Sequence, residues 1–446
     1  MIDLLLILTF CILGVLTGIL TGLLPGLHVN NIALILLSLS TTIIVLLNGL
    51  ASYGITEEFT LILIAIFILS VSISHTFHDV IPTTFLGAPD EDTALSVLPA
   101  HSLLLEGKGY EAVAISALGS YGAILVCLLI LYPIRFIIGQ PIQFYETLQD
   151  IMLYVLIAIS ILMIATEKAR ITDFKFTGKI PAFLGMGFAL FLFLLSGIFG
   201  IIALEMSVES PIGLDSPVLF PALSGLFGLP TLLTSLATQP TIPKQTIRET
   251  DYPSRHKKQT FLSIFSGSGA GILVSIIPGI TSATGTILSM TFRGESDNKQ
   301  TIITLSAVNT ACAFFVVIVL FIIQRSRSGA TLAIMELITV QEWTQIIMPL
   351  NLLYLVMALL LSGTLSYFLT LKVGKIFATH FTKVPYQPLV GGTILLIVIL
   401  VYLFTGFLGL LILFIATSIG LIPVQWGVRR SHCMGILLVP IILYFL

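Results

Sequence analysis

Two Pro-Gly pairs interrupt long apolar segments, and they stand at matching places in the two halves of the chain. Pro25-Gly26 lies in "GVLTGILTGLLPGLH" (14–28), and Pro278-Gly279 lies in "GAGILVSIIPGIT" (269–281). Small residues precede each pair at four-residue spacing, every one offset by 253 residues: Gly14, Gly18 and Gly22 in the first half, and Gly267, Gly271 and Ser275 in the second. An offset shared by several positions indicates an internal repeat.

The composition is that of an integral membrane protein. Hydrophobic residues make up 57% of the 446 positions and charged residues only 9%, whereas a soluble domain carries about 25% charged residues. The apolar runs of about 18–24 residues match a bilayer core, and they lack the alternation of a β-barrel. We therefore expect an all-α, polytopic helical bundle of roughly 10–12 spans. A net charge of −2 without a basic stripe gives no indication of nucleic-acid binding.

The expected helices follow the apolar runs between polar loops, and two segments with polar flanks are expected to be re-entrant. The helices are 2–24, 28–50, 59–80, 111–133, 148–166, 180–203, 214–237, 261–278, 281–292, 301–323, 346–370, 388–405, 406–424 and 433–446, and the re-entrant segments are 81–105 and 325–342.

The basic loops set the orientation. With the N-terminus outside, the four loops rich in Lys and Arg all fall on the cytoplasmic side. The first Pro-Gly hairpin then opens outward and the second opens inward, which predicts an inverted repeat: 1–238, a cytoplasmic linker 239–260, and 261–446. Secondary transporters often have this architecture. The alternative interpretation is that the internal duplication serves only the packing of the helices and has no role in transport.

The helix breaks are interpreted as parts of a binding site. A helix that restarts after Pro-Gly points unpaired N–H groups and its positive dipole end at a cavity, where an anion can bind. The residues expected to bind substrate at the two breaks are Pro25, Gly26, His28, Asn30, Pro278, Gly279, Thr281 and Ser282. Asn309 is a further cavity candidate, although a helix–helix hydrogen bond explains it equally well.

Two charged stretches extend the candidate site. In "SHTFHDVIPTTFLGAPDEDTALSVLPAH" (74–101), Asp79, Asp90 and Glu91 are candidates for ion coupling, because ionisable groups at membrane depth indicate function. A solvated turn, or a transition-metal site at His75 and His78, is also open. In the second half, Arg325 and Arg327 suit a carboxylate or phosphate, or alternatively reach lipid headgroups.

These stretches resemble a known family. The two hairpins "GILTGLLPGLH" and "GILVSIIPGIT", together with "FLGAPDEDTALSVLPAHSLLLEGKGYEAVAISALGSYGA", are similar to the large membrane subunit of tripartite tricarboxylate transporters, the TctA-like family, in its archaeal form. The resemblance implies an ion-coupled carboxylate carrier with a small membrane subunit and an extracytoplasmic binding protein. The chain departs from the family pattern at 87–91 (Gly-Ala-Pro-Asp-Glu) and at 325–329, where two arginines stand and the proline is missing.

The sequence as a whole predicts a multi-pass permease of the cytoplasmic membrane rather than an enzyme. It is expected to move a small organic anion by alternating access, coupled to Na⁺ or H⁺, without another cofactor or a resident metal; a homodimer is left open. One alternative is a polyprenyl-phosphate or other lipid-phosphate flippase. Another is an intramembrane metal-dependent hydrolase using His75, His78 and Asp79, although the sequence has no H-E-x-x-H motif.

Overall fold

A computed structural model describes most of the chain, and the described part is helical without strands. The described residues are 2–24, 29–47, 55–87, 97–167, 180–213, 218–238, 243–247, 254–278, 280–294, 297–380 and 386–446. Nine helices in these ranges are long and apolar enough to cross a membrane, or ten when the bent pair α8 (Phe144–Asp150) and α9 (Met152–Ala165) is counted as one span. The expected all-α polytopic fold is thus confirmed.

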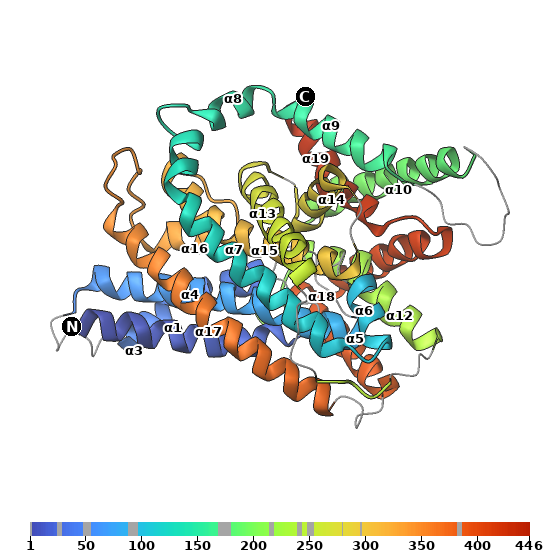
Figure 1. Cartoon of the computed structure of the whole chain (residues 1–446), viewed down its shortest axis with the longest axis horizontal. Helices are drawn as coiled ribbons and strands as arrows, with labels where there is room; N and C mark the ends of the chain where they lie inside the picture. The colour runs from blue at the N-terminus through green and yellow to red at the C-terminus, as the bar shows by residue number, and fades with distance from the viewer. Residues whose placement is uncertain are drawn as a thin grey trace.

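The first half of the chain folds around α4 (Glu57–His78), which packs against α1 (Ile2–Gly22) and α17 (Leu350–His380) (Figure 1). The other helices of this half are α2 (Val29–Ser38), α3 (Ser40–Leu47), α5 (Val80–Leu86), α6 (Val97–Leu105), α7 (Gly109–Ile138), α10 (Ile180–Leu204), α11 (Leu219–Leu223) and α12 (Leu229–Thr238), with a π-helical turn between the last two.

The second half of the chain is built on a hairpin and a long helix. The hairpin of α13 (Ser254–Ile276) and α14 (Ser282–Arg293) packs on α15 (Asn298–Ile323), which crosses the middle of the molecule beside α7 (Figure 1). The remaining helices are α16 (Gly329–Leu337), α18 (Tyr386–Trp426) and α19 (Gly435–Phe445), the last preceded by a 3₁₀ turn at Arg430–Met434.

The glycine ladders bring helix backbones into direct contact in both halves. A Cβ atom on Gly18 would lie 2.5 Å from Cβ of Ser74 in α4, and one on Gly271 would lie 2.5 Å from the carbonyl oxygen of Val308 in α15. Neither position has room for a side chain, so α1 can approach α4, and α13 can approach α15, only through glycine.

Two expected helices have a different shape in the structure, and one expected break is confirmed. The span predicted at 59–80 continues through α5 to Leu86, since Asp79 between α4 and α5 keeps helical angles (φ −61°, ψ −23°). The helix predicted at 148–166 is bent by 74° between α8 and α9. The break expected after residue 405 is present as a kink in α18, where Gly406 has φ 62°.

The outer surface is apolar and the interior holds polar groups. Side chains such as Leu129, Phe292 and Phe414 are 71–84% exposed, which is costly in water and favourable in lipid. Buried polar residues such as Asp79 and Asn309 (6% and 7% exposed) lie instead between helices. This distribution, together with the apolar helices, agrees with a multi-pass membrane protein.

Candidate functional site

A small cavity, here called the Asp79 cavity, lies between helices of the two halves of the chain. Its volume is about 10 Å³, which is room for one water-sized species. Three elements form its wall: the α4–α5 junction with Thr76, Asp79 and Val80, α7 with Ser116, and α15 with Leu305, Ser306 and Asn309.

The α4–α5 junction places a carboxyl group deep inside the protein. Residues 62–66 and 68–87 are all buried, and Asp79 is 6% exposed. Pro82 follows one turn after His78 and has no N–H to give to the carbonyl of that residue, so the regular ladder of backbone hydrogen bonds is interrupted here. Asp79 therefore lies in a buried span at a place where one backbone hydrogen bond of the helix is missing.

The hydroxyl groups of the cavity wall direct their hydrogens away from the cavity. Thr76 donates to the carbonyl of Ser72 at 2.6 Å, and Ser306 donates to the carbonyl of Ile302 at 2.9 Å. Because a hydroxyl has one hydrogen, the 2.7 Å bond between Ser116 and Ser306 then takes its hydrogen from Ser116. The hydroxyl oxygens of these three residues therefore keep lone pairs that can accept a further interaction.

The two histidines beside the cavity take part in helix contacts. His78 Nδ1 lies 2.7 Å from the carbonyl oxygen of Ser74 and Nε2 lies 3.2 Å from the Thr370 hydroxyl of α17. His75 Nδ1 lies 3.1 Å from the Thr21 hydroxyl of α1. Within the described ranges no three His, Cys, Asp or Glu side chains are grouped to hold a metal, so the transition-metal interpretation gains no support from this arrangement.

The start of α14 is connected to the same cavity. Thr281 is the N-cap, and its hydroxyl accepts a hydrogen bond from the Thr284 backbone N–H at 3.4 Å. Ser282 donates to Asn309 Oδ1 at 3.3 Å. The Thr284 hydroxyl is buried and has no hydrogen-bond partner among the described residues. The structure thus brings together Asp79, Ser282 and Asn309, three residues that the sequence had singled out.

Other candidates lie elsewhere. Asn30 accepts a hydrogen bond from the Gly329 backbone N–H at 2.9 Å, so its side chain joins α2 to the start of α16. Pro278 is half-buried at the end of the hairpin. Six predicted site residues lie outside the described residues: Pro25, Gly26, His28, Asp90, Glu91 and Gly279.

The two arginines predicted to bind substrate do not share the Asp79 cavity. They follow the last residue of α15, about 20–25 Å along the helix axis from Asn309. Arg325 lines a separate polar pocket of about 350 Å³ with Glu146 and Glu342. Arg327 donates to the Tyr145 hydroxyl at 2.6 Å and stacks over its ring at 5.6 Å.

Comparison with known proteins identifies the family. The model of the tripartite tricarboxylate transporter TctA family matches residues 8–435. The chain belongs to this TctA family. An uncharacterized protein of Methanocaldococcus jannaschii is 28% identical over 385 residues, which cover 85% of this chain and 88% of that protein. No solved structure matches. The predicted resemblance is therefore confirmed, and the chain belongs to a family of transporter components.

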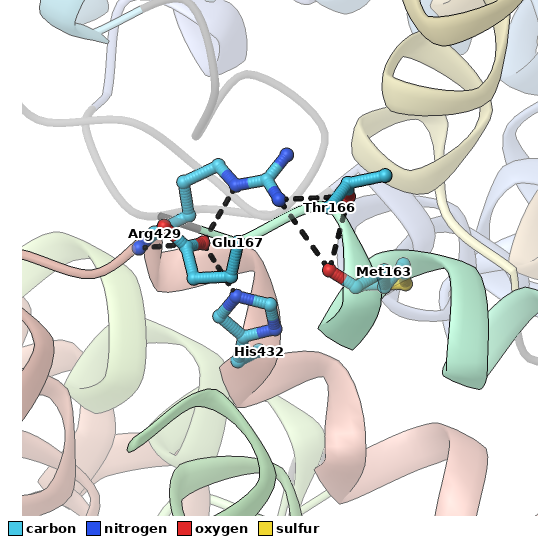
Figure 2. A network of polar contacts seen from close by, with 5 residues as sticks. All are labelled: Met163, Thr166, Glu167, Arg429 and His432. Carbon is cyan, nitrogen blue, oxygen red and sulfur yellow. Dashed lines mark hydrogen bonds and ion pairs between the residues drawn. The ribbon is translucent and has the colours of Figure 1, made fainter. Parts of the chain in front are cut away.

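This TctA-family chain also contains a buried ion-pair network that the sequence did not predict, here called the Glu167 network (Figure 2). Glu167, just after α9, accepts hydrogen bonds from Arg429 Nε and from His432 Nε2, both at 2.7 Å. Arg429 also donates to the Thr166 hydroxyl at 2.9 Å and to the Met163 carbonyl at 3.4 Å. Burial alone would raise the pKa of Glu167, but the bonds from His432 and Arg429 outweigh it and lower the pKa to about 2.

Sequence reasoning also missed the wall residues Thr76, Ser116 and Ser306. Single hydroxyl residues in apolar helices mostly bond to the carbonyl one turn earlier, as Thr76 and Ser306 do. The sequence alone therefore does not identify such residues as part of a cavity, because this depends on how the helices pack. For the Glu167 network a weak signal existed, because charged residues close to long apolar runs are expected to be paired.

Proposed function

We propose that this protein is the permease of its transport system and moves a small organic anion, a carboxylate, by alternating access coupled to Na⁺ or H⁺. The observation that carries the proposal is the hydrogen bond from Ser282 to Asn309. It joins the start of α14, where an anion would bind, to the wall of the cavity that contains Asp79, where a cation would bind.

The anion site is proposed at the helix starts that follow the Pro-Gly pairs. The first turn of α14 offers backbone N–H groups and the positive end of the helix dipole. Thr281 and Ser282 stand at this end, and the buried Thr284 hydroxyl adds a polar group without a hydrogen-bond partner among the described residues. Pro25, Gly26, His28 and Gly279 are proposed to complete the site from the two breaks.

The coupling site is proposed at Asp79. Asp79 is buried in a membrane span, and ionisable residues inside such spans commonly mark ion pathways and proton relays. When a cation or proton binds there, its positive charge raises the affinity of the adjacent site for an anion, because the local dielectric constant is low. Binding of one ion thus favours binding of the other, which is the requirement for coupled transport. Asp90 and Glu91 remain further candidates for ion coupling.

Alternating access is proposed to follow from an inverted repeat of residues 1–238 and 261–446, joined by 239–260. Both parts contain a glycine-lined helix packed on a long buried helix, with α1 on α4 and α13 on α15. The two halves also touch where Asn30 meets Gly329. Motion of the pair α1 and α4 against the pair α13 and α15 would expose the site to one side of the cytoplasmic membrane and then to the other.

The partners of the permease are proposed from the family. TctA proteins are the large subunit of tripartite systems, so a small membrane subunit and an extracytoplasmic binding protein are expected to complete this one. Long exposed apolar surfaces such as that around Phe407 and Phe414 would face lipid or a second copy of the chain.

The function can be tested by reconstitution. Purified full-length protein in proteoliposomes should take up labelled di- or tricarboxylates when a Na⁺ or pH gradient is applied, and Ser282→Ala should reduce this uptake. Thr364→Ala in α17, whose hydroxyl donates only to the carbonyl of Leu360, is a matched control and should transport normally. If no carboxylate is taken up under either gradient, while the protein is folded and inserted, the proposal fails.

A further inference from the structure

Arg430 places a guanidinium group at the depth of a membrane span. Its Nη1 atom donates to the Phe227 carbonyl at 3.3 Å and to the Thr231 hydroxyl. Phe227 and Thr231 lie near the middle of the apolar segment Leu219–Thr238, which is long enough to cross a membrane. A charged group at this depth is costly and generally marks a binding site or an ion pathway.

Arg430 forms no ion pair with an Asp or Glu among the described residues. The neighbouring Arg429, in contrast, is paired with Glu167 at 2.7 Å (Figure 2). Arg430 thus brings a positive charge into the interior that no carboxylate in the described part of the chain neutralises. The charge suits an anionic ligand.

The hydrogen bonds of Arg430 leave open the edge of the guanidinium group that suits a carboxylate. An arginine carries five N–H donors in a planar fork, and Nε together with Nη2 can bind both oxygens of one carboxylate. In Arg135 this edge is occupied, because Nε and Nη2 both donate to the Trp343 carbonyl. In Arg430 only Nη1 has hydrogen-bond partners among the described residues.

Thr231 and Phe227 hold the guanidinium group in one orientation. The Thr231 hydroxyl donates its single hydrogen to the Phe227 carbonyl at 3.0 Å, so it accepts the bond from Arg430. Phe227 belongs to the π-helical turn Ser224–Gly228, and such turns are frequent at functional sites. Because Nη1 is anchored at two points, the rest of the fork is preorganised for a ligand.

The 3₁₀ turn that carries Arg430 also contacts the start of α14. Arg430 begins this turn and Met434 ends it. The Thr281 hydroxyl, at the N-cap of α14, lies 3.7 Å from the Met434 sulfur. A 3₁₀ helix rises about 2 Å per residue, so Arg430 and Met434 are about 8 Å apart along the turn. These dimensions let an anion with two charged groups contact both the start of α14 and Arg430.

Two buried hydroxyl groups lie on the same two elements. Thr284 in the first turn of α14 is fully buried, and Ser431 beside Arg430 is 2% exposed. Neither hydroxyl has a hydrogen-bond partner among the described residues. A buried hydroxyl without a partner is costly, and an anion supplies the acceptor oxygens that such groups need.

We propose that Arg430 binds the second carboxylate of a substrate whose first carboxylate binds at the start of α14. The proposal rests on the proposed function and adds the residue that favours a substrate with two or more carboxylates over a monocarboxylate. A monocarboxylate would occupy the helix start alone and would leave Arg430 without a counter-charge.

The test measures the stabilisation of the protein by carboxylates. Detergent-purified full-length protein is titrated with succinate, with citrate and with butyrate, in Na⁺ at neutral pH and at mildly acidic pH, and the melting temperature is recorded. Succinate and butyrate have carbon chains of equal length and differ by one carboxylate. We expect succinate or citrate to bind to the wild type about ten- to hundredfold more tightly than butyrate, because only they reach Arg430.

Variants of Arg430 separate ligand binding from packing. Arg430→Gln should weaken binding of succinate and citrate about ten- to hundredfold and leave butyrate binding unchanged. Arg430→Lys keeps the charge without the planar fork and should lose less affinity. Arg135→Gln is the matched control, since Arg135 is also buried but its donors bind carbonyls of the protein. It should lower the melting temperature and bind succinate and citrate like the wild type.

The outcomes distinguish failure of this site from failure of the proposed function. If Arg430 only attached the 3₁₀ turn to α12, Arg430→Gln would melt at a lower temperature and would bind succinate and citrate like the wild type. That result, or an equal loss of affinity in Arg430→Gln and Arg135→Gln, overturns the role of Arg430 and preserves the carboxylate permease. If no carboxylate binds to the folded wild type, the proposed substrate class fails, and the role of Arg430 fails with it.

Discussion

The hydroxyl of Ser282 donates a hydrogen bond to the side-chain oxygen of Asn309 at 3.3 Å, although the two residues belong to different helices. This bond directly links the helix start after the second Pro-Gly pair to the wall of the Asp79 cavity. Three of the predictions below concern the helices it joins, and the fourth concerns the Glu167 network.

Replacement of Asn309 should uncouple the two proposed sites. Asn309→Ala removes the acceptor for Ser282 and one oxygen of the cavity wall. A hydrogen bond between neutral groups contributes about 0.5–1.5 kcal/mol, so carboxylate uptake should fall about two- to tenfold. Uptake in proteoliposomes is the measurement. Asn351→Ala, whose amide donates to the Thr339 carbonyl at an exposed site, is the control, and equal uptake by both variants would contradict the assignment.

Removal of the second helix break should abolish transport without preventing insertion. Pro278 ends the first arm of the hairpin, and alanine there would let α13 continue past Ile276. The N–H groups at the start of α14 would then form hydrogen bonds within a continuous helix and could no longer bind an anion. Pro278→Ala should therefore insert normally, by membrane fractionation, but take up no anion. Wild-type rates in this variant would refute the role assigned to the break.

The close contact of α13 with α15 should not tolerate a methyl group. A Cβ on Gly271 would lie 2.5 Å from the carbonyl oxygen of Val308, so Gly271→Ala forces the helices apart and should cost about 1–3 kcal/mol of stability. Gly269→Ala, two residues away in the same helix, has no neighbour within 4 Å of the new Cβ. It should leave the melting temperature unchanged or raise it slightly. A similar loss in both variants would show that the close contact is not responsible.

The Glu167 network should give the protein stability that depends on pH. The pKa of Glu167 is lowered to about 2 in the folded protein, from about 4.3 in an unfolded chain. A lowered pKa stabilises the folded state above the unfolded value, and this contribution is lost as the pH falls from about 4.3 toward 2.

Glu167→Gln tests this expectation. At neutral pH it should destabilise the protein by about 1–3 kcal/mol, because the bonds from Arg429 and His432 to a charged oxygen are lost. The difference from wild type should shrink as the pH falls toward 2. Thermal unfolding over a pH series measures it. Glu106→Gln breaks an exposed pair with Lys108 and should change little at any pH.

Sequence patterns predicted the membrane-spanning helices well wherever the length of an apolar run determines the helix. The break at Gly406 and the hairpin of α13 and α14 were both expected, because Gly and Pro act locally on the backbone. The continuation of α4 into α5 was not expected. Residues 81–105 were predicted to form a separate re-entrant segment, yet Asp79 and Pro82 remain helical inside a fully buried segment.

The candidate site was predictable only in part. Asp79 and Asn309 were identified as polar residues within apolar segments, and Ser282 as a residue at a helix restart. The structure places Asp79 and Asn309 in the wall of one cavity, and Ser282 donates a hydrogen bond to Asn309. Ser116 and Ser306 were not identified, since their meeting depends on how α7 crosses α15 rather than on any local pattern. Arg325 and Arg327 were assigned to substrate by charge alone, but the length of α15 separates them from Asn309.

The bond between Asn30 and Gly329 has a consequence for the order of events during synthesis. The oxygen is in the second residue of α2, and the N–H that it receives belongs to a residue 299 positions later. At about 5–20 residues per second, the ribosome needs roughly 15–60 s to deliver that partner. The first hairpin is therefore made and inserted well before α16 exists. The Gly329 N–H at the start of α16 meets Asn30 only when the newly synthesised second half docks on the first. This contact is therefore among the last to form in each new molecule.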